Sequence, residues 1–244
     1  MGEIIKISGL TVYSLGFFSA ISFLWGAFIF YKKTSETHLE EDRILDLIAI
    51  SGFWGFLIGR VGFVILNYST FVKHWTRVLM ITSYPGLDRW FVLLGFVLAL
   101  IVGLKKERSK YFDYLDKFSL AFVAGSGVFW AFLSLIFFEW QRAVIGLLFV
   151  IATFWLWKLE NQYRFFDWYK GNKNSARPGF VTAVGFSIVG LAFIFELVIY
   201  KSSFLFSYVF GFLIFVVGLF LLYIRSGRVL VEDLYFLKKW KKTK

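Results

Sequence analysis

The 244-residue sequence contains no cysteine, two prolines and only two histidines, His38 and His74. The absence of cysteine excludes disulfides, thiolate catalysis and Cys-ligated zinc or iron–sulfur sites. Two histidines leave almost no ligands for a transition metal, so no metal site is expected. Charged residues are scarce at 18%, whereas hydrophobic residues make up 59% and the mean hydropathy is +0.70. One soluble core of this length cannot enclose so much apolar surface, which excludes a soluble domain.

Seven charge-poor runs interrupt the sequence, most of them near the length of about 20 helical residues that crosses a bilayer. They predict an all-α integral membrane protein with about seven transmembrane helices. The third and fifth runs are short, so we expect these helices to tilt or to extend into their flanks. The runs cover residues 7–31, 47–66, 90–104, 118–138, 143–157, 179–200 and 204–224.

The distribution of Lys and Arg predicts the orientation of these spans. The loops after the first, third and fifth runs and the tail hold 20 of the 27 basic residues, and the opposite side holds six. Positive charge accumulates in cytoplasmic loops, so the amino terminus is expected outside and the carboxyl terminus in the cytoplasm. The net charge of +11 then indicates anchoring to anionic lipid rather than binding to nucleic acid. We predict a membrane domain over residues 1–224 and a basic amphipathic cytoplasmic tail over 225–244.

Two charged residues lie within the apolar runs, Arg60 in the second and Glu196 in the sixth. A charge near the membrane centre costs roughly 2.5–3.5 kcal/mol on insertion scales, so each one requires a partner or a function. A buried Arg60–Glu196 pair is the simplest hypothesis. Asn67 follows Arg60 by seven residues and shares its helix face, so both could line a polar pocket in which the guanidinium binds a phosphate. The alternative is an Arg60 that only pairs with Glu196 or caps backbone carbonyls.

Small residues within the runs are interpreted as packing positions. Glycines 52, 55, 59 and 62 are spaced by three, four and three residues, which places them on one helix face that another helix can approach closely. Gly125, Ser126 and Gly127 have the same interpretation, because no histidine lies in any run to activate the serine. In the loop between the second and third runs, His74 is a titratable group that could act as a base.

Several segments resemble the prolipoprotein diacylglyceryl transferase family. Residues 59–66, GRVGFVIL, resemble its GxRxGYVLF region, and residues 13–17, YSLGF, resemble its first-span tyrosine region. Residues 177–180 and 190–196 resemble its sixth-span G-x-RF-x-x-E segment. The resemblance implies seven spans in a bacterial-type plasma membrane. It also implies transfer of a diacylglyceryl group from phosphatidylglycerol to the lipobox cysteine of a preprolipoprotein, with no cofactor. By the same resemblance Tyr13, Arg60 and Glu196 line the lipid pocket.

The sequence departs from the family pattern at several positions. Where the family has GGMSFHGG with an essential histidine, residues 85–92 read PGLDRWFV, with Trp90 in place of the histidine. Where the family has GRxGNFxNxE, residues 125–132 read GSGVFWAF. Ala192 replaces the sixth-span arginine, and the family's head insertion between the fourth and fifth spans shrinks to residues 139–142.

Two hypotheses follow from this resemblance and these departures. In the first, the chain is an active transferase in which Arg60, helped by Arg89, binds the headgroup phosphate of phosphatidylglycerol or another anionic lipid. His74 or Asp88 would then serve as the base for the incoming thiol. In the second, the chain is a catalytically silent relative that binds lipid or a partner protein on the same scaffold.

Overall fold

A computed structural model describes residues 3–7, 10–36, 40–72, 75–80, 84, 86–105, 111–169, 178–200 and 205–225. For residues 3–7, 10–13, 15, 75, 163–169, 200 and 205–207 it describes only the backbone. The chain divides into two compact units. The first comprises residues 1–20 and 30–111, and the second comprises residues 21–29 and 112–244. Helix α1 (Ser14–Thr34) contributes to both units.

The first unit begins with a short hairpin that was not predicted. Strands β1 (Glu3–Ile7) and β2 (Leu10–Tyr13) pair antiparallel, with Lys6 opposite Thr11, and α1 starts directly after β2. The predicted helical architecture holds for the rest of the described chain, but residue 7 lies in β1, so the first helix begins at Ser14 and not at residue 7. Isoleucine, valine and threonine dominate the two strands, and their branched Cβ atoms favour extended backbone. Because the hairpin takes up the residues before Ser14, the helix formed by the first apolar run, α1, is 21 residues long.

Helices α2 (Glu41–Leu66) and α4 (Arg89–Gly103) pack against each other in the first unit, joined by α3 (Tyr68–Phe71) and the 3-10 helix η1 (Trp75–Val78). The predicted glycine face of α2 makes this contact. Gly59 and Gly62 are covered by the α4 side chains of Val92 and Phe91, with no room for a Cβ. On the other helix, a Cβ added at Gly95 would lie 2.7 Å from the carbonyl oxygen of Trp54.

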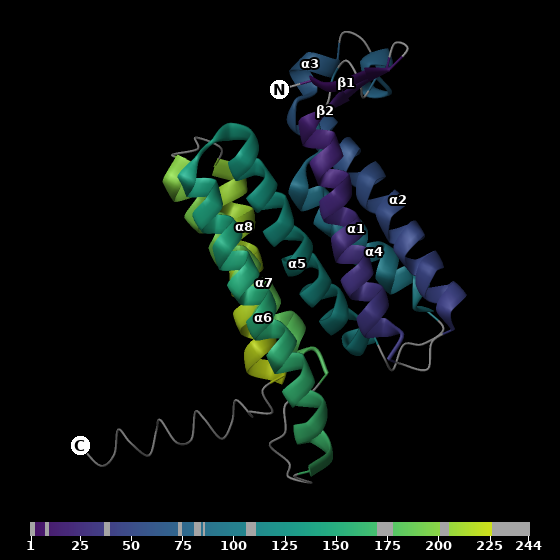
Figure 1. Cartoon of the computed structure of the whole chain (residues 1–244), viewed down its shortest axis with the longest axis vertical. Helices are drawn as coiled ribbons and strands as arrows, with labels where there is room; N and C mark the ends of the chain where they lie inside the picture. Colours follow the sequence, from purple (N-terminus) through teal and green to yellow (C-terminus); the bar gives the residue numbers. More distant parts are fainter. Residues whose placement is uncertain are drawn as a thin grey trace, which may run out of the picture. The chain divides into compact units, whose positions relative to one another are not determined.

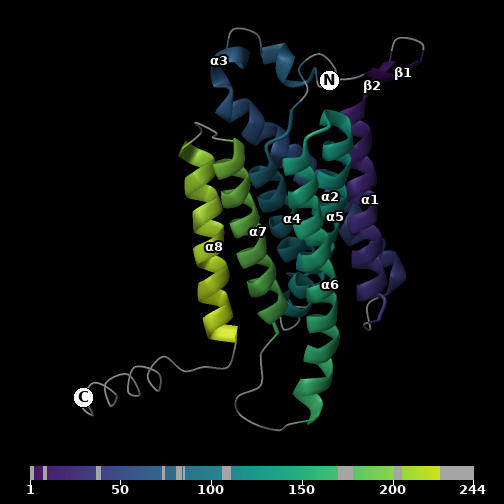
Figure 2. The same ribbon diagram turned by 60° about the vertical axis from the view of Figure 1, so that its left-hand side comes forward.

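The second unit contains α5 (Tyr111–Phe137), α6 (Trp140–Tyr169), α7 (Phe180–Tyr200) and α8 (Leu205–Arg225). Helices α7 and α8 run side by side in both views (Figures 1 and 2), and α6 also contacts α7. Gly190 and Gly218 permit the close approach of α7 and α8, since a Cβ at either position would meet backbone atoms of the facing helix. The Ser126 hydroxyl donates to the carbonyl oxygen of Phe122 in its own helix, which agrees with a packing interpretation.

Each predicted apolar run overlaps one helix, although the first run also includes residues of the hairpin. Within the described residues, five helices are long and apolar enough to cross a membrane, namely those in 41–66, 111–137, 140–162, 180–199 and 208–225, and α4 is a shorter apolar helix. The chain is therefore a helical, multi-pass membrane protein. The count of seven spans and the orientation of the termini stay predictions. The tail after Arg225 lies outside the described residues.

Candidate functional site

Arg60 lies near the carboxyl end of α2, where its side chain is 5% exposed. Its guanidinium donates four hydrogen bonds, all to backbone carbonyl oxygens of the connection between α2 and α4. Nε donates to Val78 across 3.0 Å and Nη2 to Arg77 across 3.3 Å. Nη1 donates to Tyr84 across 2.7 Å and to Gly86 across 3.1 Å. One buried side chain thus joins four carbonyls that the sequence spreads over ten residues.

Aromatic rings surround the same guanidinium. Its central carbon lies 5.6 Å from the ring centroid of Phe63 and 5.6 Å from that of Phe71. Phe71 is 2% exposed and also contacts Phe63 and Tyr84 edge-on, with centroids 6.1 and 6.2 Å apart. The negative faces of aromatic rings attract a cation. Ring faces and carbonyl oxygens together stabilise the buried charge.

This geometry bears on the two interpretations of Arg60. A guanidinium has five N–H donors, and four hydrogen bonds to carbonyls are already formed. A phosphate that bound two of these N–H groups would displace at least one carbonyl, whose part-buried oxygen would then lose this donor. The contacts observed are those of the carbonyl-capping interpretation. Glu196 lies half-buried in α7 of the second unit, and its pairing with Arg60 stays a prediction.

Asp88 is the N-cap of α4. Its Oδ1 accepts hydrogen bonds from the backbone N–H groups of Trp90 and Phe91, at 3.0 and 3.1 Å. Its own backbone N–H donates to the carbonyl oxygen of Gly59 across 3.0 Å, which ties the start of α4 to α2. A carboxylate at this position satisfies N–H groups that the first turn leaves without helical partners. A role for Asp88 as a base stays a prediction, and its geometry is that of a helix cap.

Two further candidates lie near the same ends of α2 and α4. Asn67 ends α2, and its side-chain Nδ2 donates to the carbonyl oxygen of Phe63 across 2.9 Å, one turn back in its own helix. The guanidinium of Arg89 lies 5.5 Å from the ring centroid of Trp90. Trp90, at the position of the family histidine, is 1% exposed. The sequence analysis predicted that Arg60 and Asn67 line a polar pocket. In the structure both side chains donate hydrogen bonds to backbone carbonyl oxygens.

The remaining sequence-predicted residues are only partly described. His74 lies outside the described residues, as does the side chain of Tyr13. The backbone of Tyr13 is opposite Glu3 in the hairpin. Whether either residue contacts a substrate stays a prediction.

Asp116 in α5 is a buried carboxylate that the sequence analysis missed. It is 4% exposed, and its Oδ2 accepts from the backbone N–H of Gly179 across 2.8 Å. Its Oδ1 accepts from the backbone N–H and the hydroxyl of Thr182, each across 2.6 Å. An acidic residue two positions before one apolar run, with Pro178 and Gly179 at the start of another, is the signal that could have predicted this contact. The carboxylate caps α7 and joins it to α5.

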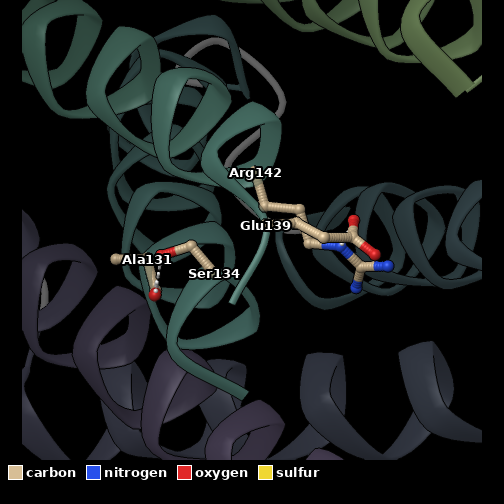
Figure 3. Close-up of polar contacts among 4 residues, drawn as sticks. All are labelled: Ala131, Ser134, Glu139 and Arg142. Atoms are coloured by element: carbon tan, nitrogen blue, oxygen red, sulfur yellow. Dashed lines mark hydrogen bonds and ion pairs between the residues drawn. The ribbon is translucent and has the colours of Figure 1, made fainter. Parts of the chain in front are cut away.

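The turn between α5 and α6 is short, at the position where the resemblance places a head insertion. Figure 3 shows Arg142 and Glu139 side by side, with Nε donating to Oε2 across 2.7 Å. One turn earlier, the Ser134 hydroxyl donates to the carbonyl oxygen of Ala131 across 2.7 Å. Phe138 has a positive φ of 51° and is 93% exposed. The turn therefore presents one neutralised ion pair and an exposed ring.

Comparisons with known proteins identify relatives that are phosphatidylglycerol–prolipoprotein diacylglyceryl transferases. The protein of Caldanaerobacter subterraneus is 35% identical over 104 residues, which is 41% of this chain and 40% of the relative. That of Staphylococcus saprophyticus is 25% identical over 123 residues, 50% of this chain and 44% of the relative. The chain thus matches less than half the length of these relatives. No family model matches it. The resemblance predicted from the sequence is confirmed, and the chain is a divergent relative of these enzymes.

Proposed function

We propose that this divergent relative of the diacylglyceryl transferases binds phosphatidylglycerol in a bacterial plasma membrane and does not transfer the diacylglyceryl group. Lipid binding is supported by the relatives, whose name specifies phosphatidylglycerol as a substrate. It is also supported by the apolar helices, which give the chain continuous access to bilayer lipid. Proteins that keep a scaffold after losing its chemistry retain binding when the binding surface does not depend on the lost groups.

The contacts of Arg60 are the observation that carries the second half of the proposal. Transfer requires a cation that stabilises the charge of the phosphate as it leaves, and a base for the incoming thiol. The Arg60 guanidinium donates hydrogen bonds to four carbonyl oxygens of its own unit. Oδ1 of Asp88 accepts hydrogen bonds from two backbone N–H groups. Trp90, where the family has histidine, is a buried indole that cannot act as a base at neutral pH.

Lipid binding is tested on the full chain in nanodiscs that contain equal amounts of phosphatidylglycerol and phosphatidylcholine. After detergent extraction, native mass spectrometry reads the lipids that remain bound. We expect adducts with phosphatidylglycerol to exceed those with phosphatidylcholine. Equal retention of both lipids by folded protein would contradict the binding half of the proposal.

The transfer reaction is tested in the same nanodiscs with a lipobox cysteine peptide, and the peptide is read by mass spectrometry for a diacylglyceryl thioether. We expect no adduct. An adduct that disappears in Arg60→Ala but persists in Arg142→Ala would support the active transferase instead, with Arg60 as the headgroup ligand. Arg142 is a suitable control because Glu139 already neutralises it (Figure 3).

A further inference from the structure

A second arginine in the first unit, Arg77, contacts an aromatic ring but lacks the hydrogen bonds to backbone carbonyls that Arg60 makes within the described residues. Arg77 belongs to η1, and its guanidinium carbon lies 5.0 Å from the ring centroid of Tyr84. Among the residues that the structure describes, no carboxylate pairs with Arg77. A cation–π contact uses the face of the guanidinium and does not use its in-plane N–H groups. Those N–H groups are the ones that bind phosphate oxygens.

Two apolar side chains follow Arg77 directly and are exposed. Leu79 is 84% exposed and Met80 is 49% exposed. Adjacent exposed apolar side chains are unfavourable in water, at roughly 25 cal/mol per Å² of apolar surface. At a bilayer interface the same side chains lie among acyl chains, where this cost disappears. A cation next to exposed leucine and methionine therefore matches the chemistry of an anionic lipid. The phosphate would contact the cation, and the acyl chains would contact the apolar side chains.

The backbone holds this segment in a fixed conformation. The N–H of Leu79 donates to the carbonyl oxygen of Thr76, and the N–H of Met80 donates to that of Arg77, each across 3.2 Å. The Arg60 guanidinium binds the carbonyl oxygens of residues 77 and 78 on one side of the exposed pair and those of 84 and 86 on the other. Local backbone hydrogen bonds thus order residues 76–80, and an ordered backbone loses little conformational entropy when it binds.

The position of the segment in the chain agrees with a bilayer contact. Helix α2, which is long and apolar enough to cross a membrane, ends at Leu66, ten residues before Thr76 and eleven before Arg77. Near that end of α2, Ile65 and Tyr68 are 58% and 56% exposed. An exposed tyrosine at the end of an apolar helix is typical of the membrane interface. The segment that contains Arg77 follows this boundary in the sequence.

We propose that Arg77, Leu79 and Met80 form a binding site for an anionic phospholipid, in which Arg77 contacts the headgroup phosphate and the two apolar side chains contact the acyl region. This inference rests on the proposed function and names the residues that would carry its lipid preference. Neither the family resemblance nor the contacts of Arg60 point to these three residues as lipid ligands. A juxtamembrane arginine contributes about 1 kcal/mol of attraction to anionic lipid, so removing its charge is expected to lower the preference about five-fold.

The absence of cysteine in the chain makes a direct test possible, because Leu79→Cys introduces a single thiol for a fluorophore. Headgroup-labelled quencher lipids are added as phosphatidylglycerol or as phosphatidylcholine at equal density. We expect phosphatidylglycerol to quench the fluorophore at position 79 more strongly, by about five-fold at low lipid fraction, and Arg77→Gln to abolish the difference. Phe138→Cys is the matched control, since it is also exposed but lies beside the neutralised Arg142–Glu139 pair. There the two lipids should quench equally.

Two results would overturn the inference. One is equal quenching by both lipids at position 79 in folded protein. The other is a preference for phosphatidylglycerol that persists in Arg77→Gln. If native mass spectrometry still shows preferential retention of phosphatidylglycerol in either case, the proposed function stands and the lipid binds elsewhere. If retention shows no preference in the unsubstituted chain, the proposed function itself fails.

Discussion

Asp116 in α5 accepts two hydrogen bonds from Thr182 in α7, one from the backbone N–H and one from the hydroxyl, each across 2.6 Å. A third hydrogen bond comes from the backbone N–H of Gly179. The carboxylate thus supplies the acceptors that the first turn of α7 needs, and it does so from a different helix. Pairing α7 with α5 in this way joins segments that lie more than sixty residues apart in the sequence.

The capping role of Asp116 predicts a loss of stability when the carboxylate is removed. Asp116→Ala is expected to lower the free energy of unfolding by about 2 kcal/mol, because three donors lose a buried acceptor. Asp116→Asn keeps one acceptor oxygen and should lose less. Thermal unfolding in detergent measures both. Asp46→Asn, at an exposed carboxylate, is the control and should be near neutral. Equal melting temperatures for Asp116→Ala and the unsubstituted chain would contradict the capping role.

The contact between α2 and α4 predicts that a single methyl group at Gly95 is destabilising. A Cβ there would lie 2.7 Å from the carbonyl oxygen of Trp54 and 2.9 Å from the Cα of Gly55, so the helices must separate. Overpacking of this kind typically costs about 1–3 kcal/mol. Gly16→Ala is a matched control, since nothing lies within 4 Å of a Cβ added there. It should stabilise α1 by up to about 1 kcal/mol. Chemical unfolding of both variants checks the sign of each change.

Arg60 is expected to affect the stability of the first unit. Arg60→Ala leaves four part-buried carbonyl oxygens without this donor, which should cost on the order of 3 kcal/mol. Arg60→Lys should not rescue the fold, because an ammonium group on a flexible stem cannot reproduce the planar fork. Limited proteolysis between α2 and α4 reports the loss. Arg142→Ala removes a partly exposed pair and should change stability by about 0–1 kcal/mol. Full resistance to proteolysis in Arg60→Lys would indicate that charge alone matters.

Two substitutions of Asp88 distinguish a structural role of this residue from a chemical one. As an N-cap, Asp88→Ala should cost about 1 kcal/mol, and Asp88→Ser should restore most of it, because a serine hydroxyl also accepts from the first-turn N–H groups. A base for thiol activation would not be replaced by serine. Melting temperatures of the two variants make the comparison. A serine variant as unstable as the alanine variant would count against the capping role.

The helix packing could be predicted from the sequence better than the polar contacts could. The glycine spacing in α2 correctly located the face on which α4 packs, because a missing Cβ has a direct steric meaning. The β1–β2 hairpin was missed because isoleucine and valine are as apolar in a strand as in a membrane helix. Hydropathy does not distinguish the two when the run continues into α1.

The candidate site shows a different limit. The burial of Arg60 could be anticipated from its position in an apolar run, but its partners could not. They are backbone carbonyls, which every residue carries, so no side-chain pattern marks residues 77, 78, 84 and 86 as acceptors. Asp116 was missed for a related reason, since two of its three donors are backbone N–H groups. Side-chain patterns alone therefore do not predict the partners of Arg60 or Asp116.

The central claim is that the chain binds phosphatidylglycerol without transferring its diacylglyceryl group. The most direct measurement incubates the nanodisc-embedded chain with a lipobox cysteine peptide, beside the Caldanaerobacter subterraneus relative as the positive control. Mass spectrometry then quantifies the diacylglyceryl thioether and the lipid retained by each protein. The account predicts retained phosphatidylglycerol and no thioether for this chain. A thioether formed by this chain, and lost in Arg60→Ala protein that remains folded, would contradict it.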